Sequence, residues 1–264
     1  MKKMFVMTHK NFEVPEIDDF FAIEVGAAIR DSNYGYIKDD SFDNISEKNN
    51  SFCELTGLYW IWKNVNCEYI GLCHYRRYFS KFLLESNPCN YYSMDHLVNL
   101  LKRYDIILPK CFCWRRHTVE TAYYQCGCGK KKDLGIIREI IEERYPKYAN
   151  VFDSVMKQKR ASYCNMFVCS KDKLDEYCEW LFDILFEAEK RIDISNYSKE
   201  EARVFGYMSE ILLNVWVKEK HYRVKYVPVV TNAPLSFYFR ILSKLEKFPV
   251  LGIIASITLC KDIR

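Results

Sequence analysis

Short apolar runs with polar ends recur along the chain and predict the strands of a sheet. The first, MFVMTH, is apolar until it ends in Thr8 and His9. Short runs of this kind are typical of strands buried in the core of a domain. The strands that they predict lie at residues 4–9, 22–29, 69–74, 105–109, 164–169 and 222–230.

Between these runs, apolar residues spaced three and four apart predict helices. The pattern Ser51-x-x-Glu54 matches a capping box and predicts that a helix begins there, with Leu55, Leu58 and Trp62 on one face. A second such pattern, Ser198-x-x-Glu201, predicts a helix that continues to about residue 219. Helices are also predicted at 94–104, at 133–145, where Pro146 ends the pattern, and through the apolar series from 174 to 186.

Alternating strands and helices with short links are typical of an α/β fold with a mostly parallel central sheet flanked by helices. Residues 31–51 and 110–132 lack periodicity and are predicted to be loops. Ligands of such folds bind beyond the carboxyl ends of the strands. We therefore expect His9, the segment 74–77 and the polar residues after strand 164–169 to share one edge.

Composition narrows the class of protein. The net charge of +4 over 264 residues is too modest to indicate a nucleic-acid-binding face. The N-terminus lacks the apolar core and cleavage site of a secretory signal, and no run approaches the length of a membrane span. We therefore expect a cytoplasmic protein whose 12 cysteines are reduced. The motifs of dinucleotide, P-loop, α/β-hydrolase and zincin enzymes are absent from the sequence.

The last 29 residues differ from the rest. Residues 236–264 mix aromatic and aliphatic residues with five cationic ones, Arg240, Lys244, Lys247, Lys261 and Arg264. A basic amphipathic segment of this kind is predicted to attach to a membrane surface. The alternative is a helix that packs on the core of the same domain.

The segment His74-Tyr75-Arg76-Arg77 concentrates cationic side chains at the end of a predicted strand. Guanidinium groups match the oxygens of phosphates, so the segment is a candidate site for a diphosphate. The alternative is that the arginines pair with surface acids such as Glu68. Because side chains alternate along a strand, Arg76 and Arg77 are not expected to face the same ligand.

Two further groups are candidates for binding or catalysis. The stretch 42–57 offers polar side chains that could bond a base or a sugar, although turn and cap chemistry explains several of them. Glu210 lies seven residues after Arg203 on the same helix face, where it could act as a general base or be a solvated edge residue. The candidates in the first stretch are Asp43, Asn44, Glu47, Asn49 and Glu54.

The cysteines at 111, 113, 126 and 128, with His117 between them, could bind zinc. The C-x-C spacing is tighter than that of common zinc sites, so incidental thiols in a loop are the favoured interpretation.

Taken together, the stretches 43–64, 69–79, 164–191 and 202–217 resemble the bacterial DUF4422 family of capsular and exopolysaccharide gene clusters, whose members are regarded as glycosyltransferases. The HYRR block after an apolar strand, preceded by NISEK and ELTGLYWIWKN, carries the resemblance, which extends over about residues 3–230. It implies one GT-A-like catalytic domain at 1–235 followed by the amphipathic tail 236–264.

The resemblance also implies a function. It predicts transfer of a hexose from a nucleotide sugar, with UDP-galactose in pyranose or furanose form as the first candidate, to a polyprenyl-linked capsular, exopolysaccharide or O-antigen acceptor at the inner face of the cell membrane. GT-A enzymes usually carry a D-x-D motif that holds a divalent metal on the diphosphate. Here that strand ends in His74-Tyr75-Arg76, so cations of the protein are predicted to replace the metal, and Mn²⁺ or Mg²⁺ binding stays open.

The implied site follows from the same matches. The donor nucleotide is expected against Thr8, His9 and the loop 43–49, the diphosphate at the HYRR block and Arg203, and the sugar near Asn165 and Glu210. If the enzyme inverts, Glu210 is the predicted base, with Glu54 in reserve, and His74 and Arg76 complete the catalytic group. The nucleotide-sugar-binding set is Thr8, His9, Asp43, Asn44, Glu47, Lys48, Tyr75, Arg77, Asn165 and Arg203. A sugar-nucleotide or polyanion-binding protein without catalysis, or a sugar phosphotransferase, would fit the same residues.

Overall fold

The computed structural model describes residues 1–83, 86–114 and 116–232, and the predicted tail 236–264 lies outside them. The helices are α1 (Asn49–Phe52), α2 (Leu55–Asn64), α3 (Met94–Leu101), α4 (Val119–Gln125), α5 (Lys131–Arg144), α6 (Pro146–Met156), α7 (Lys171–Arg191) and α8 (Val204–Glu219), with 3₁₀ turns η1 (Ala27–Ile29), η2 (Ser46–Lys48), η3 (Pro88–Asn90) and η4 (Glu201–Arg203). The strands are β1 (Lys2–Thr8), β2 (Phe20–Glu24), β3 (Ile37–Lys38), β4 (Tyr69–His74), β5 (Arg77–Phe79), β6 (Ile106–Pro109), β7 (Phe112–Cys113), β8 (Arg160–Ala161), β9 (Phe167–Ser170), β10 (Val224–Val227) and β11 (Val229–Thr231).

The central sheet is mixed but mostly parallel, as expected. Its strand order is β10-β6-β9-β4-β1-β2-β3, with β5 and β11 attached beside β4. Strands β1, β2, β3 and β4 run parallel to one another, and β10 runs parallel to β6. Only β9 in this order runs antiparallel to both of its neighbours, β4 and β6.

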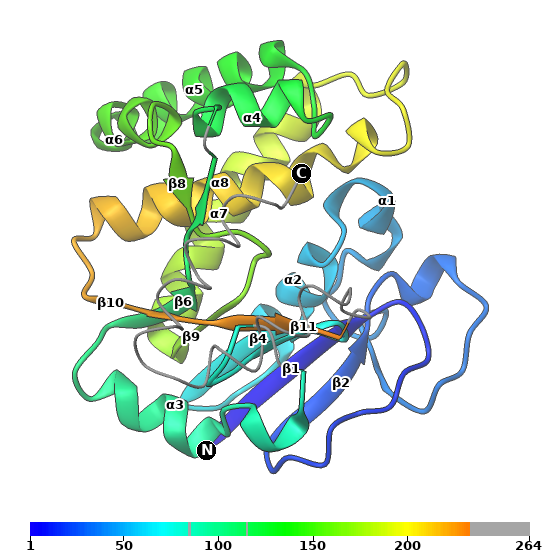
Figure 1. Ribbon diagram of the computed structural model, residues 1–264. Coiled ribbons are helices and arrows are strands. Elements are labelled where there is room, and N and C mark those ends of the chain that lie inside the picture. The colour runs from blue at the N-terminus through cyan, green and yellow to red at the C-terminus, as the bar shows by residue number, and fades with distance from the viewer. Residues whose placement is uncertain (84–85, 115, 233–264) are drawn as a thin grey trace.

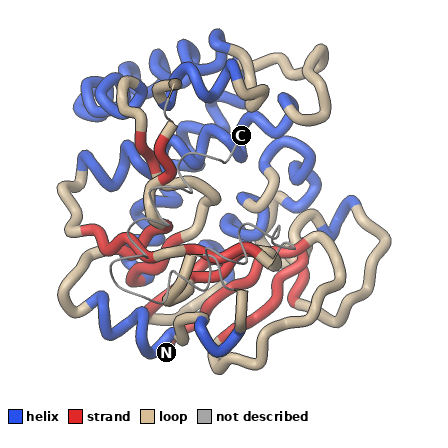
Figure 2. Tube along the Cα trace, in the orientation of Figure 1, coloured by secondary structure: helices blue, strands red, loops and turns tan. Residues whose placement is uncertain are grey.

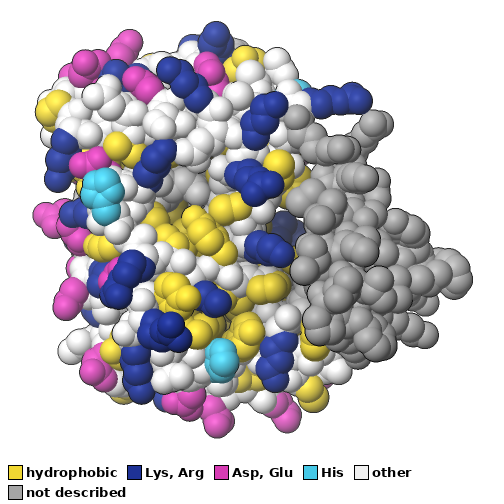
Figure 3. Space-filling view, turned by 60° about the vertical axis from the view of Figure 1, so that its left-hand side comes forward, with side chains coloured by type: hydrophobic (Ala, Val, Ile, Leu, Met, Phe, Trp, Pro, Cys, Tyr) yellow, Lys and Arg dark blue, Asp and Glu magenta, His cyan; other side chains and the backbone are white. Residues whose placement is uncertain are grey.

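Helices cover both faces of the central sheet, as Figure 1 shows, and the tube in Figure 2 displays its strands as one layer, with the separate pair β7 and β8 on one side of it. Successive residues of β1 explain this, because Met4 and Val6 pack on the α3 side and Phe5 and Met7 on the side of α2, α7 and α8. Figure 3 shows one face of the molecule, where hydrophobic side chains gather between Lys and Arg side chains. None of the helices in the described ranges is long and apolar enough to span a membrane.

Several predicted elements need correction. The loop predicted at 110–132 contains β7 and α4, and Pro146 begins α6 rather than only ending α5, because proline is tolerated in the first turn of a helix. The strand predicted at 22–29 ends at Glu24, and Pro228 divides the one predicted at 222–230 into β10 and β11. The bounds predicted for β4, residues 69–74, are confirmed.

The direction of β9 corrects the expected ligand edge. Because β9 is antiparallel, the residues after it lie at the amino ends of the parallel strands, and the residues before it, Cys164 and Asn165, lie at their carboxyl ends. The expectation for the residues after strand 164–169 was therefore wrong.

Candidate functional site

A cavity of about 720 Å³ lies at the carboxyl ends of β1, β2 and β4. The sheet contributes its floor, and the junction of α1 with α2 and the start of α8 contribute its other walls. Ten of the predicted site residues line it, namely Thr8, His9, Asn49, Glu54, His74, Tyr75, Arg76, Arg77, Arg203 and Glu210. They come from segments far apart in the sequence that the sheet edge brings together.

Arg76 and Arg77 both line this cavity, contrary to the expectation from strand alternation. The chain does not continue as a strand past His74. It reverses through a two-residue turn at Tyr75 and Arg76, so that His74 pairs with Arg77 in the antiparallel β5. Directly opposed residues of a hairpin point to the same face, which places the side chains of His74 and Arg77 side by side.

The rest of the turn is held by its aromatic side chain. The Tyr75 ring contacts the ring of His9 edge-on with centroids 5.5 Å apart, and that of Phe12 at 5.9 Å. The Tyr75 N–H donates to the Met7 carbonyl over 3.0 Å. Contacts with β1 thus fix the turn that presents Arg76, whose side chain is exposed.

A single residue, Cys164, joins His74 to Glu210. The Cys164 N–H donates to Oε1 of Glu210 over 2.8 Å, and its carbonyl oxygen lies 2.6 Å from Nε2 of His74. Because a carbonyl oxygen only accepts hydrogen bonds, Nε2 of His74 carries the hydrogen, and Nδ1 is the nitrogen that gains or loses a proton.

The turn that contains Cys164 is strained. Cys164 and Asn165 have φ values of 78° and 47°, a left-handed conformation that asparagine tolerates and other side chains rarely adopt. Asn165 anchors it, because its amide nitrogen donates to Oε1 of Glu54 over 2.7 Å and to the Gly206 carbonyl over 3.2 Å. Its amide oxygen accepts the hydroxyl of Ser209 over 3.0 Å. Strain of this kind clusters at functional sites.

Glu54 is therefore a residue of the cavity and not a helix cap. The predicted capping box at Ser51 and Glu54 was wrong, because α2 begins at Leu55 without a side-chain cap and the hydroxyl of Ser51 bonds the Lys48 carbonyl. The box predicted at Ser198 and Glu201 does form, with both reciprocal hydrogen bonds present, and leads through η4 into α8.

Two arginines enter the cavity from its other walls. The Nε of Arg203 donates to the sulfur of Cys53 over 3.2 Å, and its guanidinium lies 5.2 Å from the centre of the Tyr207 ring. Arg30, which the sequence patterns missed, donates to the Val25 carbonyl and, over 2.8 Å, to Oδ1 of Asn49.

The cavity carries an excess of positive charge. Arg30, Arg76, Arg77, Lys199 and Arg203 line it together with only two carboxylates, Glu54 and Glu210. None of the five cations forms an ion pair with a carboxylate in the described part of the chain. Unpaired cations that converge on one cavity are an arrangement suited to an anionic ligand.

Burial shifts the pKa of the titratable groups in the cavity. It lowers the pKa of His74, against the opposing charge of Glu54, so the ring is neutral at neutral pH. Burial, helped by the charge of Arg30, also lowers the pKa of His9. The pKa of Glu210 is raised to about 8, first by burial and then by the neighbouring charge of Glu54.

The remaining predicted residues do not line this cavity. Asn165 lies just behind it, buried, where it supports the turn. Lys48 pairs with Glu189 over 2.7 Å, Oδ1 of Asp43 accepts the Tyr59 hydroxyl over 3.1 Å, and the Asn44 side chain bonds its own loop. Glu47 is exposed. The next residues along, Asn49 and Asn50, do line the cavity.

No metal site is preformed among the residues of known position. Within the three described ranges, no three His, Cys, Asp or Glu side chains lie close enough together to hold a metal ion, at the cavity or at the cysteines of 111–128. The zinc hypothesis is therefore not supported, and the cysteines of that segment are free thiols.

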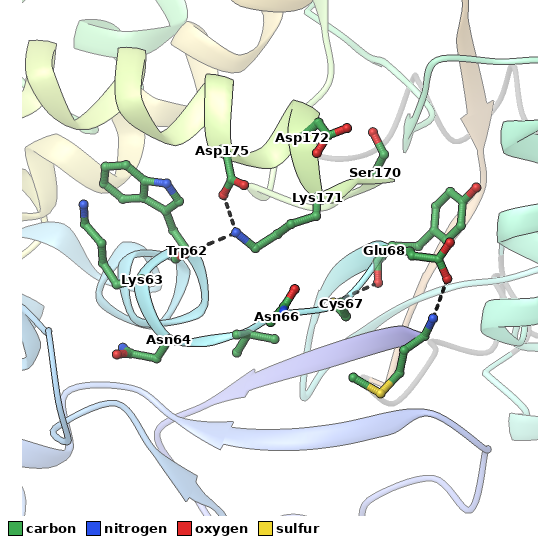
Figure 4. Close-up of a pocket in the computed structure, with 13 residues that line it drawn as sticks. Trp62, Lys63, Asn64, Asn66, Cys67, Glu68, Ser170, Lys171, Asp172 and Asp175 are labelled. Atoms are coloured by element: carbon green, nitrogen blue, oxygen red, sulfur yellow. Dashed lines mark hydrogen bonds and ion pairs between the residues drawn. The ribbon is translucent and has the colours of Figure 1, made fainter.

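A second cavity of about 850 Å³ opens at the opposite edge of the sheet, at the start of β4 and of α7. Figure 4 shows that Lys171 pairs with Asp175 and bonds the Trp62 carbonyl. The N-terminal amine pairs with Glu68 over 2.5 Å, and Lys63 lies 3.5 Å from the centre of the Trp62 ring. Of the cations that line this cavity, only Lys63 is without a carboxylate partner in the described part of the chain, against five in the first cavity.

Comparison with known proteins adds to this geometry. The apo structure of the WbbM bifunctional glycosyltransferase is similar to this chain, with 28% sequence identity and a TM-score of 0.81. The similarity covers 89% of this chain and 46% of that one, so the chain spans less than half the length of that protein. No curated protein matches the sequence. The model of a domain of unknown function, DUF4422, matches residues 3–221, and the chain therefore belongs to the DUF4422 family.

Proposed function

We propose that the chain is a glycosyltransferase with a GT-A-like domain over 1–235, which transfers a hexose from a nucleotide sugar to a saccharide acceptor. The observation that carries the proposal is the set of five cations without carboxylate partners beside Glu54 and Glu210 at the carboxyl edge of the sheet. Cations of this kind bind a diphosphate, and an inverting glycosyl transfer uses a carboxylate close by as the base. The similarity to the WbbM glycosyltransferase supports the same reaction class.

The donor is placed along the floor of the cavity. Its nucleoside lies against Thr8, His9 and the neighbouring Asn49 and Asn50, and its diphosphate meets Arg76 and Arg77, with Arg203 opposite. The neutral His74 contributes hydrogen bonding and orientation rather than charge, because burial lowers its pKa. The loop 43–48 does not contact the nucleoside in this arrangement. It contains η2, which directly precedes Asn49 and so positions that residue beside the nucleoside.

Glu210 acts as the base in this proposal. Its Oε1 holds the Cys164 N–H, which leaves Oε2 without a partner among the residues described and able to take the proton of the acceptor hydroxyl. The acceptor oxygen then attacks the anomeric carbon as the bond from that carbon to the diphosphate oxygen breaks. Negative charge grows on the leaving diphosphate, and the arginines stabilise it most strongly at that stage.

The GT-A fold implies a divalent metal, but the residues present do not fit one. The strand that carries D-x-D in GT-A enzymes is followed here by Arg76 in the turn and Arg77 in β5, whose charges repel a cation. We propose that the arginines supply the charge on the diphosphate, and no step of the reaction is assigned to a metal.

We also propose which donor and which acceptor the enzyme uses. The donor is a UDP-hexose, with galactose in pyranose or furanose form first, and the acceptor is a polyprenyl-linked capsular, exopolysaccharide or O-antigen chain. Such acceptors lie at the cytoplasmic membrane surface, and the basic segment 236–264 suits attachment to anionic lipids there.

The test is release of nucleoside diphosphate from UDP-, GDP- and dTDP-hexoses, in EDTA and in Mn²⁺, with and without a saccharide acceptor. The proposal predicts release from one nucleotide series that persists in EDTA and increases with acceptor. A protein that binds one of these nucleotide sugars but never releases its diphosphate would instead be a binding protein.

A further inference from the structure

An aromatic cluster lies next to the turn at Cys164, on the antiparallel pair of β7 and β8. Phe112 and Trp114 come from β7 and the residue after it, and Tyr163 follows β8. The ring of Trp114 contacts Phe112 at 4.8 Å and Tyr163 at 6.1 Å between centroids, both close to perpendicular. These three residues are called the aromatic wall below.

The aromatic wall is held by hydrogen bonds and is partly exposed. The indole nitrogen of Trp114 donates to the Tyr163 hydroxyl over 2.7 Å, and the Trp114 N–H donates to the Lys159 carbonyl over 2.7 Å. All three side chains are half-buried rather than packed in the core. Rings whose polar atoms are already bonded offer a fixed apolar surface to a ligand.

Hydrogen bonds join the backbone on both sides of Tyr163 to side chains of α8, at Glu210 and, one turn later, at Asn214. Ser162 exchanges two hydrogen bonds with the side chain of Asn214, of 2.9 and 2.7 Å, and Asn214 also donates to the Glu210 carbonyl over 2.7 Å. On the other side, the Cys164 N–H donates to the Glu210 carboxylate. The aromatic wall is thus adjacent to the proposed base, and its position is coupled to that of Glu210.

The ligand class follows from the chemistry of the two neighbouring surfaces. The cavity offers its cations to an anion, whereas Phe112, Trp114 and Tyr163 carry no charge at neutral pH and offer ring faces and edges. Apolar rings beside a few fixed polar groups are typical of sites for uncharged small molecules. The C–H face of a sugar ring suits such a surface, and its hydroxyls suit the carboxylate next to it.

We propose that the aromatic wall binds the saccharide acceptor by stacking and directs its hydroxyl group toward Glu210. This inference deepens the proposed function and rests on it for the reaction, but saccharide binding by the wall can be measured without any donor.

The test uses saturation-transfer NMR with the methyl glycosides of galactose, glucose and N-acetylglucosamine, with and without UDP, on the full chain. We expect transfer to at least one glycoside, reduced roughly tenfold in Trp114→Ala, the scale of one lost aromatic contact. Trp114→Phe, which keeps a ring, is expected to retain most of it. The matched control is Tyr104→Ala, because Tyr104 is a half-buried aromatic residue before the start of β6, at the other edge of the sheet.

Each result separates the two proposals. Equal transfer in the wild type, Trp114→Ala and Tyr104→Ala would overturn the aromatic wall as the binding site, as would no transfer to any glycoside. Loss in folded Trp114→Ala, shown by an unchanged circular dichroism spectrum, supports it. If the wall binds saccharide but no nucleotide sugar is bound or turned over, the proposed function fails while the saccharide site stands.

Discussion

His74 and Glu210 form hydrogen bonds with the two backbone polar groups of the same residue. Nε2 of His74 donates to the Cys164 carbonyl oxygen, and the Glu210 carboxylate accepts the Cys164 N–H. The strained turn at Cys164 therefore sets the separation of a neutral imidazole from a carboxylate whose pKa is raised to about 8. A group that is mostly protonated at neutral pH becomes a strong base when it loses its proton.

The first prediction concerns the pH dependence of turnover. If Glu210 is the base, the rate rises with pH and levels off above about 8, the pKa of its carboxyl group. Burial is the largest cause of this raised pKa, and the negative charge of Glu54 is the second. Glu54→Gln removes that charge, so the rise in rate should move to lower pH. The Gln side chain can still accept the hydrogen bond from the Asn165 amide. Initial rates of both proteins between pH 5 and pH 10 measure this, and an unmoved midpoint in Glu54→Gln would contradict it.

The second concerns stability. Because the pKa of Glu210 is higher in the folded protein than in the unfolded chain, the folded protein holds the extra proton, and its stability falls as pH rises from about 4.5 to about 8. Glu210→Gln cannot ionise and should lack this decline, with an advantage of about 4–5 kcal/mol at pH 8.5 that is nearly gone at pH 4.5. Thermal unfolding across this range is the measurement. A constant difference between the two proteins would show that Glu210 ionises normally.

The third tests the anchor of the strained turn. Asn165→Ala removes bonds to Glu54, Gly206 and Ser209 and places alanine at φ 47°, so we expect a loss of about 2–4 kcal/mol of unfolding free energy. Turnover should fall more than nucleotide-sugar affinity, since the turn positions Glu210. Ser209→Ala removes one of these bonds and serves as the graded control. Equal effects of the two substitutions would contradict an anchoring role.

The fourth uses two glycines with similar backbones. At Gly26, φ is 69°, and an added Cβ would lie 2.3 Å from the Arg30 guanidinium and 2.5 Å from Asn49. At Gly35, φ is 74° and the space is open. Alanine at either site costs about 1 kcal/mol for the backbone, but only Gly26→Ala should also weaken nucleotide-sugar binding, because it displaces Arg30. Calorimetric titration of both variants decides the matter, and equal affinities would exclude Arg30 from the site.

Local patterns in the sequence predicted the parts of this site that lie on one continuous segment. The apolar run before His74 predicted β4 to the residue, and Thr8 and His9 lie at the end of β1 as expected. The sequence could not predict the direction of β9, because a short apolar run has the same pattern in a parallel and in an antiparallel strand. The hairpin at Tyr75 and Arg76 was missed, since it contains none of the glycine or asparagine residues that announce such turns.

Residues that act through tertiary contacts were the least predictable. Glu54 fitted a capping pattern, and only the fold places Asn165 against it. Arg30 and Lys199 lack a local motif and line the cavity because η1 and the segment before η4 lie beside it. The residues Asp43, Asn44 and Lys48 matched the family pattern but bond neighbouring side chains and their own loop.

The central claim is that Arg76 and Arg77 stabilise the diphosphate of a nucleotide sugar. The most direct measurement compares wild type, Arg76→Ala, Arg77→Ala and Arg103→Ala in nucleotide-sugar turnover with EDTA present. Arg103 is the matched control, an exposed arginine between α3 and β6 at the other edge of the sheet. We predict that kcat falls roughly a hundredfold in each of the first two variants, about 2.7 kcal/mol of lost transition-state stabilisation, with little change in acceptor KM and none in Arg103→Ala. An unchanged kcat in Arg76→Ala and Arg77→Ala would contradict the account.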